Sequence, residues 1–300
     1  MKIGIAGTGR MGAAIGERLL AEGHDLVVWN RTRDKTKLLV EAGAAEAETP
    51  AALAGQVDTV ITILTNADAI DGVFRGPNGL LSGDVAGKLF IEMSTVRPVT
   101  EEKLAAEVRA KGAAMVDAPV GGTTGPARDG KLVGLVGGDE ADVARARPIL
   151  EKLCKRLDHV GPIGAGASFK LAINLPLVVY WQALGEALSL CNQHGVEPER
   201  IADLMADTSG GPNVMKVRGS VVAAALKGET VPGTFDIDSI RKDMRTMLEE
   251  AEARGVELPL VARTLACYDA CSEAGMGAGD PAMETAFWLN RGSAQTKQNG

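Results

Sequence analysis

The chain has 300 residues, of which 45% are hydrophobic, 3% are aromatic and 24% are charged, and its formal net charge at pH 7 is −7. This length suits one large domain or two medium domains, and an acidic chain with so few aromatic residues offers no obvious surface for nucleic acid. The four cysteines form no C-x-x-C pair and the three histidines are scattered, so we expect neither a disulfide nor a metal site.

The first thirty residues have the pattern of a dinucleotide-binding β-α-β unit. Apolar runs at 3–6 and 26–29 predict two strands, and residues of helical periodicity lie between them. Gly7, Gly9 and Gly12 follow the first run in G-x-G-x-x-G spacing. In such a unit the first glycine makes a tight turn, the second lets N–H groups approach a pyrophosphate, and the third lets helix pack on strand. The alternative is a glycine-rich turn without a ligand, and the order of strand, turn, helix and strand favours the nucleotide.

The end of the second predicted strand is positively charged where NAD-binding folds usually have a carboxylate. Asp or Glu there binds the ribose 2′-hydroxyl and would repel a 2′-phosphate. Here the strand is followed by Asn30, Arg31 and Thr32, and Arg33 and Lys35 add positive charge nearby. Arg31 can pair with a phosphate through two charge-assisted hydrogen bonds, and Thr32 can add a hydroxyl donor. The alternative is a set of ordinary solvated residues, but their position predicts that NADP(H) is preferred over NAD(H).

Predicted strands and helices alternate until about residue 160. Strands are expected at 57–64, 88–93, 113–116, 131–136 and 158–160, and helices at 100–111 and 141–153. This alternation predicts a doubly wound sheet with a mostly parallel core, in which ligands bind beyond the carboxyl ends of the strands. Three segments lie at such ends, namely 64–66, 94–95 and 117–123.

Residues 165–193 form one long, almost uniformly apolar stretch. About 20 consecutive apolar residues could form a transmembrane helix, but polar residues within the stretch and the lack of positive flanks favour a helix buried between domains or subunits. The following residues are nearly all helical by periodicity, with breaks at 210–212 and 231–233. We therefore expect an α/β, doubly wound (Rossmann) N-terminal domain, an inter-domain helix and an all-α C-terminal domain, at 1–162, 163–193 and 194–300.

Lys170 and Asn174 are four residues apart on the long helix and therefore share a face. Burial favours the neutral form of a lysine and eases proton exchange, whereas a lysine near the start of a helix can also extend into solvent. Spacing alone leaves both readings open. Pro176 has no N–H for the carbonyl of Ala172, so we expect a kink between residues 170 and 176, unless the helix begins only at Pro176.

Four motifs in matching order and spacing resemble those of the β-hydroxyacid dehydrogenase family, which includes 3-hydroxyisobutyrate dehydrogenases and tartronate semialdehyde reductases. They are IAGTGRMG at 5–12, DAPVGGTTGPARDG at 117–130, GAGASFKLAIN at 164–174 and FDIDSIRKD at 235–243. The resemblance implies that Lys170 is catalytic with Asn174 as its partner, and that Thr95 and Lys242 bind cofactor and substrate. It also implies a helical second domain and a homodimer or homotetramer.

The chain departs from the family pattern at one substrate-binding segment. The family usually has Ser-Gly-Gly after Asp-x-Pro-Val, and its serine contacts the substrate carboxylate. Here Gly121, Gly122 and Thr123 stand in that place. The first hydroxyl is therefore missing, and Thr123, two residues further on, is the candidate to replace it. This departure concerns the identity of the substrate more than the chemistry.

The predicted activity is NADP-dependent interconversion of a small β-hydroxyacid, or a related hydroxyacid, and its semialdehyde or aldehyde. NADPH would supply hydride to the carbonyl carbon, and protonated Lys170 would give the alkoxide its proton. The alternatives are an imine reductase, which generally lacks a lysine at this position, and a nucleotide-binding regulator, which would not need Lys170, Asn174 and Lys242. Because the first strand begins at once, with no room for a signal peptide, we expect a cytoplasmic protein without a membrane partner.

The predicted site residues fall into two sets. The cofactor-binding set is Gly7, Thr8, Gly9, Arg10, Met11, Gly12, Asn30, Arg31, Thr32, Leu64, Thr65, Asn66, Thr95 and Lys242. The substrate-binding set, for a small aldehyde or hydroxyacid that carries a carboxylate, is Ser94, Gly121, Gly122, Thr123, Lys170, Asn174 and Phe235.

Overall fold

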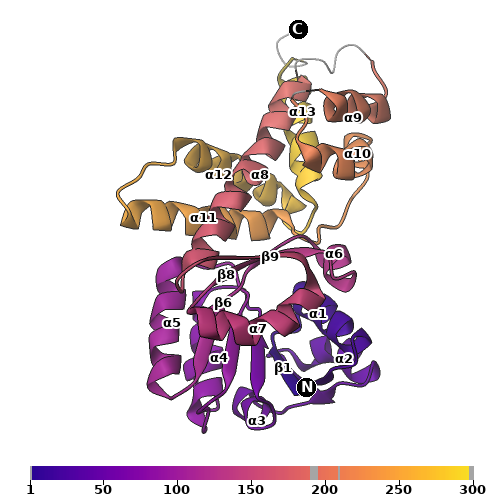
Figure 1. The fold of residues 1–300 in the computed structure, drawn as a ribbon. Helices are drawn as coiled ribbons and strands as arrows, with labels where there is room; N and C mark the ends of the chain where they lie inside the picture. The colour runs from indigo at the N-terminus through magenta and orange to yellow at the C-terminus, as the bar shows by residue number, and fades with distance from the viewer. Residues whose placement is uncertain (1, 190–194, 209, 297–300) are drawn as a thin grey trace. The chain divides into compact units, whose positions relative to one another are not determined.

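A mostly parallel sheet forms the centre of the first of two compact units, which comprise Met1–Ala172 and Ile173–Gly300. The computed structural model, drawn in Figure 1, describes residues 2–189, 195–208 and 210–296. Within residues 2–172, nine strands pair in the order β3-β2-β1-β4-β5-β6-β8-β7, and β9 pairs with β8. The strands are β1 Lys2–Ala6, β2 Asp25–Trp29, β3 Ala45–Glu46, β4 Thr59–Thr62, β5 Leu89–Glu92, β6 Ala114–Asp117, β7 Val120–Gly121, β8 Leu132–Gly137 and β9 Cys154–Gly161.

The pairing directions agree with the burial of the strands. Strands β1 to β6 pair in parallel, with Ile5 between Val28 and Ile61. Every residue of β4, β5 and β6 is buried, as expected for parallel strands that have helices on both faces. Strand β8 runs antiparallel to β6 and β7 and parallel to β9. The segment between β6 and β8 contains only a two-residue strand and a five-residue helix, so it lacks the long crossover that a parallel return requires.

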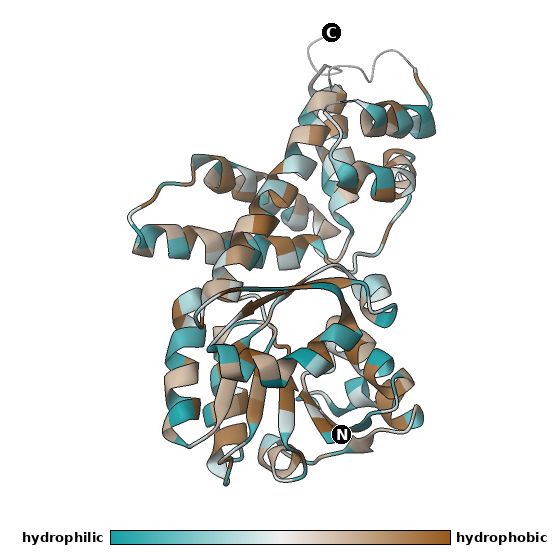
Figure 2. Cartoon of the chain, viewed as in Figure 1, coloured by the Kyte–Doolittle hydropathy of each residue, from teal (hydrophilic) through white to brown (hydrophobic). Residues whose placement is uncertain are grey.

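Helices on both faces of the sheet create two hydrophobic cores. One core joins α1 and α7 to strand residues such as Ile3 and Ile5, and the other joins α4 and α5 to residues such as Val27 and Val60. Figure 2 shows brown hydrophobic segments along the strands and more teal on the surrounding helices. The helices are α1 Arg10–Ala21, α2 Lys37–Glu41, α3 Pro50–Ala54, α4 Ala67–Arg75, α5 Pro98–Ala110, α6 Thr124–Arg128 and α7 Glu140–Leu153, with 3₁₀ turns at Arg33–Thr36 and Leu80–Ser82.

The predicted doubly wound architecture is confirmed, although several element boundaries differ. The strand expected at 57–64 is shortened to β4, and the strand expected at 158–160 is the end of the longer β9. The elements that were not predicted are short, from two residues in β3 to nine in α4. Such short segments contain too few periods of either secondary structure for a clear hydrophobic pattern.

The second unit is built from helices, and its first helix begins in the first unit. Helix α8, Ala165–Ser189, contains Pro176 in its interior, so the alternative in which the helix starts at that proline is wrong, while the expected kink stays a prediction. Residues 190–193 of the predicted helix lie outside the described residues. The predicted breaks separate α9 from α10 and α10 from α11. The helices are α9 Pro198–Asp207, α10 Asn213–Leu226, α11 Ile237–Ala253, α12 Pro259–Cys271 and α13 Pro281–Thr296, with a π-helical turn at Ser272–Met276.

Within the second unit, α8 is a core helix. The Tyr268 hydroxyl donates to the carbonyl oxygen of Val178 at 3.2 Å, and the Thr285 hydroxyl donates to that of Trp181 at 3.0 Å. A Cβ atom on Gly185 would lie 3.1 Å from the Thr285 carbonyl oxygen, so α8 and α13 pack closely. By length and composition alone α8 could cross a membrane, but a single such helix is weak evidence because a core helix has the same properties.

Candidate cofactor and substrate site

The glycine-rich turn after β1 combines close packing with open space. A Cβ atom on Gly7, whose φ is +105°, would lie 2.3 Å from the carbonyl oxygen of Ile63, and one on Gly12 would lie 1.9 Å from that of Gly7. A Cβ atom on Gly9 would meet no atom within 4 Å. Gly9 is the N-cap residue of α1, and as a glycine it has no side chain that could bond to the N–H groups of the first turn. Packing therefore requires two of the glycines, and the third leaves the helix N-terminus open to an anion.

The next residues of the turn show how the two cofactor segments are joined. The backbone N–H of Thr8 donates to Oδ1 of Asn30 at 3.1 Å, and Nδ2 of Asn30 donates to the carbonyl oxygen of Thr32 at 2.9 Å. Asn30 therefore connects the glycine turn to the end of β2. The Thr8 hydroxyl is buried and has no hydrogen-bond partner among the described residues. A bound cofactor that supplied a polar atom here would satisfy this hydroxyl, which fits a dinucleotide site.

The positive charges after β2 are not equivalent. Nε of Arg33 donates to Oε2 of Glu46 at 2.7 Å, and the Thr36 hydroxyl bonds to the other oxygen of the same carboxylate. These two partners lower the pKa of Glu46, Thr36 having the larger effect. The positive charge expected from Arg33 is therefore offset by its ion pair with Glu46. Arg31 is exposed and forms no ion pair with any residue that the structure describes, so it remains available to a phosphate.

The ends of β4 and β5 are tied together by a serine. The Ser94 hydroxyl donates to Oε1 of Glu92 and accepts the backbone N–H of Leu64 at 2.7 Å. Ser94 is only 2% exposed, and its side chain connects the two strand ends. The expected contact of Ser94 with substrate stays a prediction. Asn66 caps α4 by accepting the N–H of Ala69 at 2.9 Å. Thr65 is exposed and Thr95 is half-buried.

Asp117, the aspartate of the second motif, caps the N-terminus of the helix that carries Lys170. Oδ1 of Asp117 accepts the N–H of Gly164 and Oδ2 accepts that of Ala167, each at 2.8 Å. A Cβ atom on Gly166 would lie 2.8 Å from Oδ2, so the glycine permits this close approach. Burial raises the pKa of Asp117, and the N–H donors oppose that rise. Lys170 is half-buried on this first part of α8. Asp117 was not predicted to have this role.

The Gly121–Thr123 segment lies a few residues after Asp117, the last residue of β6. Gly121 belongs to β7, and a Cβ atom there would meet only Val133 at 3.8 Å, which is ordinary contact. Gly122 has a φ of +124°, and a Cβ atom on it would lie 2.7 Å from the side chain of Leu132. Thr123 precedes α6 but its hydroxyl does not cap that helix. The hydroxyl of Thr123 is therefore not used to cap the described helix α6.

In the second unit, a buried carboxylate joins two of the predicted residues. Nδ2 of Asn174 donates to Oδ2 of Asp243 at 3.0 Å, and Nζ of Lys242 lies 2.6 Å from Oδ1. Asp243 is 1% exposed and Asn174 is 5% exposed. Phe235 is half-buried just before α11. Asp243 was not predicted as a site residue, although it is the last residue of the fourth motif and could have been recognised there. A buried carboxylate needs polar partners, and Asn174 and Lys242 provide them.

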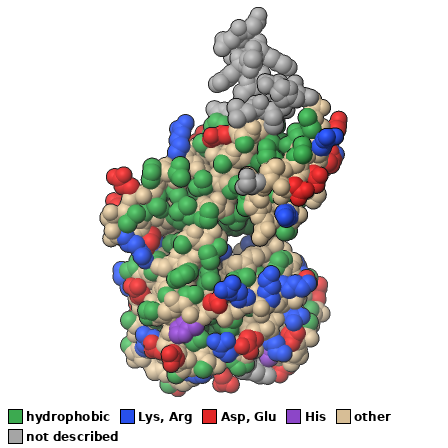
Figure 3. Space-filling view, turned by 45° about the horizontal axis from the view of Figure 1, so that its top comes forward, with side chains coloured by type: hydrophobic (Ala, Val, Ile, Leu, Met, Phe, Trp, Pro, Cys, Tyr) green, Lys and Arg blue, Asp and Glu red, His purple; other side chains and the backbone are tan. Residues whose placement is uncertain are grey.

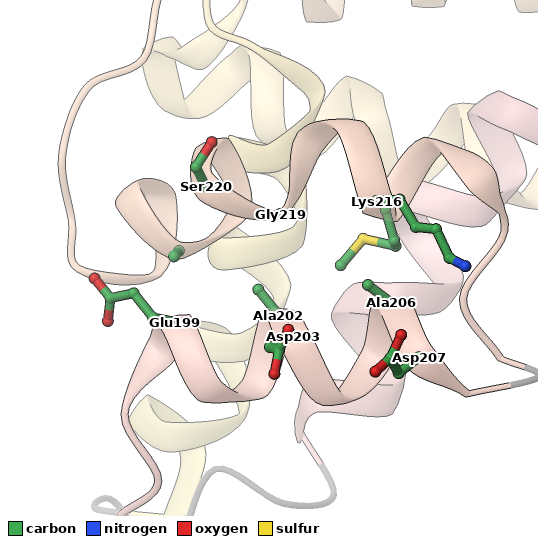
Figure 4. Close-up of a pocket in the computed structure, with 10 residues that line it drawn as sticks. Glu199, Ala202, Asp203, Ala206, Asp207, Lys216, Gly219 and Ser220 are labelled. Carbon is green, nitrogen blue, oxygen red and sulfur yellow. The ribbon is translucent and has the colours of Figure 1, made fainter.

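A separate pocket of about 410 Å³ lies between α9 and α10 (Figure 4). It contains none of the predicted site residues. Its lining residues are Glu199, Ala202, Asp203, Ala206, Asp207, Met215, Lys216, Gly219, Ser220 and Ala223.

Within the described part of the chain, no group of three His, Cys, Asp or Glu side chains is placed to hold a metal ion. Cys154, Cys267 and Cys271 are buried, and burial raises the pKa of the Cys154 and Cys271 thiols to about 12.

Sequence comparisons cover almost the whole chain. Residues 2–161 match the family described as the NAD binding domain of 6-phosphogluconate dehydrogenase, and residues 164–285 match the one described as "NAD-binding of NADP-dependent 3-hydroxyisobutyrate dehydrogenase". The 3-sulfolactaldehyde reductase of Escherichia coli (strain K12) is 34% identical over 93% of this chain and 92% of its own. The 3-hydroxyisobutyrate dehydrogenase of Pseudomonas aeruginosa is 34% identical over 91% of this chain and 93% of its own.

Solved structures agree with these relationships. The 3-hydroxyisobutyrate dehydrogenase of Mycobacterium tuberculosis, solved with L-serine, superposes with a TM-score of 0.83 at 25% identity, over 95% of this chain and 97% of its own. A reductive aminase from Aspergillus terreus has a TM-score of 0.64 at 22% identity, over 96% of this chain and 99% of its own, and this likeness concerns the fold alone. The chain therefore belongs to the β-hydroxyacid dehydrogenase family, whose members are NAD(P)-dependent oxidoreductases.

Proposed function

We propose that this protein interconverts a small β-hydroxyacid, or a related hydroxyacid, and its semialdehyde or aldehyde by NADP(H)-dependent hydride transfer. The observation that carries the proposal is the capping of α8 by Asp117. This contact joins the motif that contains the Gly121–Thr123 segment to the helix that carries Lys170. A half-buried lysine near a capped helix end suits proton transfer to a small substrate.

The cofactor preference rests on the end of β2. Exposed Arg31 has no ion pair with a described residue, and the carboxylate of Glu46 is paired with Arg33. A guanidinium binds a phosphate through two charge-assisted hydrogen bonds. We therefore infer that NADP(H) is preferred over NAD(H). When bound, the nicotinamide supplies or accepts the hydride.

The chain's own groups would handle the proton and the substrate. Protonated Lys170 would give its proton to the alkoxide oxygen during reduction and take it back during oxidation. Asn174, whose amide is held by Asp243, would orient the substrate or the lysine. The backbone N–H groups of the Gly121–Thr123 segment would bind an acidic group, and the family resemblance gives Lys242 a role in binding cofactor or substrate. The Thr123 hydroxyl, which does not cap α6, would add one donor to the acidic group.

The names of related proteins indicate the class of substrate. A relative in Arabidopsis thaliana is a glyoxylate/succinic semialdehyde reductase, with 32% identity over 92% of this chain and 94% of its own. This relative and the sulfolactaldehyde and hydroxyisobutyrate enzymes are named for small aldehydes or hydroxyacids that bear an acidic group. We infer a substrate of the same size and charge for this protein.

We also propose that the protein is a homodimer or homotetramer. Figure 3 shows hydrophobic side chains gathered on the visible face of the helical unit. Several large hydrophobic residues of this unit are exposed, including Leu204 at 53%, Val217 at 78% and Leu260 at 67%. Contiguous apolar surface on a monomer favours association. Sedimentation equilibrium would test this expectation, and a monomer at micromolar concentration would contradict it.

Steady-state kinetics would test the proposed activity. NADPH and NADH would each be tried with glyoxylate, succinic semialdehyde, other short semialdehydes and a cyclic imine. We expect the highest kcat/KM with NADPH and a carboxylate-bearing aldehyde. If the cyclic imine were the best substrate, the hydroxyacid assignment would be wrong and an imine reductase would replace it.

A further inference from the structure

Two carboxyl groups that the proposed mechanism does not use face each other inside the first unit. Glu92 ends β5 and Glu101 lies in the first turns of α5, and both are 0% exposed. No N–H or hydroxyl group of the described residues reaches either oxygen of Glu101. The polar group that it meets is the carboxyl of Glu92.

The surroundings of this pair do not provide a compensating positive charge. Neither glutamate forms an ion pair with a described lysine, arginine or histidine, and the other charged group that faces them is Asp117 of β6. Thr62 of β4 lies near Glu92, with 3.4 Å between its hydroxyl and Oε1. Two ionised carboxylates in contact without water are strongly unfavourable, and one proton shared between them removes the repulsion.

The proton belongs on Glu101. Glu92 accepts the backbone N–H of Ser94 at 2.8 Å and also its hydroxyl, and both bonds stabilise the Glu92 anion. Glu101 has no such donors, and burial, with the Glu92 charge as the second cause, raises its pKa well above the usual range. Burial also raises the pKa of Glu92, although the bonds from Glu101 and Ser94 oppose that rise. The pair is therefore a carboxylic acid that donates to a carboxylate.

This hydrogen bond is connected to the cofactor segment. Ser94, held by Glu92, accepts the N–H of Leu64, the first residue of the segment after β4. A Cβ atom on Gly7 would lie only 3.0 Å from the Leu64 side chain, so this residue packs beside the glycine turn. Any shift of Glu92 would move Ser94, and with it Leu64, which packs beside the glycine turn.

We propose that protonated Glu101 is a positioning residue for the cofactor site. Its proton bonds to Glu92 and holds it in the orientation that fixes Ser94 and Leu64. Loss of this proton at alkaline pH places two negative charges in contact. The repulsion separates the start of α5 from the end of β5, and the Leu64 segment loses its support. Cofactor binding therefore weakens as Glu101 ionises. This inference rests on the proposed cofactor site.

The test compares variants that can and cannot replace the proton. The amide of Glu101→Gln donates to Glu92 at every pH, whereas Glu101→Met is neutral and of similar length but cannot donate. The matched control is Glu102→Gln, because Glu102 is the next residue of α5 and is exposed. The Kd of NADPH would be measured by fluorescence between pH 6.5 and pH 9.5, and thermal unfolding of each cofactor-free protein would be followed over the same range.

For the native protein and Glu102→Gln we expect the Kd of NADPH to rise as Glu101 ionises, by up to about tenfold per pH unit. The Kd of Glu101→Gln should lack this rise. The Kd of Glu101→Met should be higher than that of Glu101→Gln throughout, and the change should appear in the KM for NADPH more than in kcat. A Glu101→Gln curve that follows the native curve would overturn the inference, as would equal affinity in the Gln and Met variants.

Thermal unfolding separates this inference from the proposed function. If no form of the protein bound NADPH or NADH, the proposed cofactor site would fail. The Tm of the native protein, relative to Glu101→Gln, should still fall with rising pH because folding then has to retain the Glu101 proton. If the native protein bound NADPH but its pH dependence were unchanged by Glu101→Gln, only the positioning role would fail.

Discussion

Asp243 accepts a hydrogen bond from Asn174 at 3.0 Å while its other oxygen lies 2.6 Å from Nζ of Lys242. This buried carboxylate holds two residues that have proposed roles in substrate binding. Removing a partner from such a site leaves polar groups unsatisfied. Asp243 is therefore expected to affect activity even where it does not touch substrate.

We predict that Asp243→Ala lowers kcat/KM and reduces the free energy of unfolding by about 1–3 kcal/mol, the usual effect of unsatisfied buried polar groups. Asp243→Asn should lose less stability because its amide can still bond one partner. Glu249→Gln, at an exposed position of the same helix, is the control. Urea unfolding and steady-state kinetics would measure both effects, and an Asp243→Ala variant with native kinetics would rule out the proposed role.

Cofactor discrimination should depend on Arg31. We predict that Arg31→Ala weakens NADPH binding by about ten- to a hundredfold, because a hydrogen bond to a charged group contributes roughly 1.5–3 kcal/mol. Its NADH affinity should barely change. Arg33→Ala should have a smaller effect because Arg33 is already paired with Glu46. Equal catalytic efficiency with both cofactors in the native protein would contradict the preference for NADP(H).

Glu284 should make the helical unit sensitive to alkaline pH. Burial raises the pKa of this carboxyl from 4.5 to about 8, the Glu186 charge adds to the rise, and the nearby indole of Trp288 opposes it. Its stabilising contribution is therefore fully present below about pH 4.5 and is lost progressively as the pH rises towards about 8, because only the unfolded chain releases the proton over this interval.

We therefore predict that Glu284→Gln gains stability relative to the native protein as the pH rises from 5 to 8. The gain is limited to about 1.4 kcal/mol per pH unit. Glu273→Gln is the control, since Glu273 is exposed. Differential scanning calorimetry across this range would measure the difference, and parallel Tm curves for the native protein and Glu284→Gln would exclude a buried, protonated Glu284.

Much of the fold could be predicted because its long elements have clear patterns. The apolar runs that became β1, β4 and β5 are buried on both faces, and the long apolar stretch became α8. The antiparallel pairing of β8 could not be predicted, because it depends on how short the elements between β6 and β8 are. Short helices such as α3 give too little pattern to be recognised.

The candidate site was predicted less completely, because several of its residues depend on contacts distant in sequence. Asp117 caps a helix that begins only at Ala165, far along the chain. Arg33 is neutralised by Glu46 of a neighbouring strand. Ser94 stands at a strand end, as expected for a ligand-binding residue, but its hydroxyl is used inside the protein. Local patterns identify where such residues stand, whereas their partners depend on tertiary structure.

Lys170 is proposed to be the general acid and base of an NADP(H)-dependent oxidoreductase. The most direct test is single-turnover reduction of the best aldehyde by Lys170→Met with NADPH already bound. We predict that NADPH affinity stays within a few-fold of native, while the rate of hydride transfer falls by about 10²–10⁴-fold, the usual contribution of general acid catalysis. A variant that binds NADPH and keeps more than about a tenth of the native rate would contradict the claim.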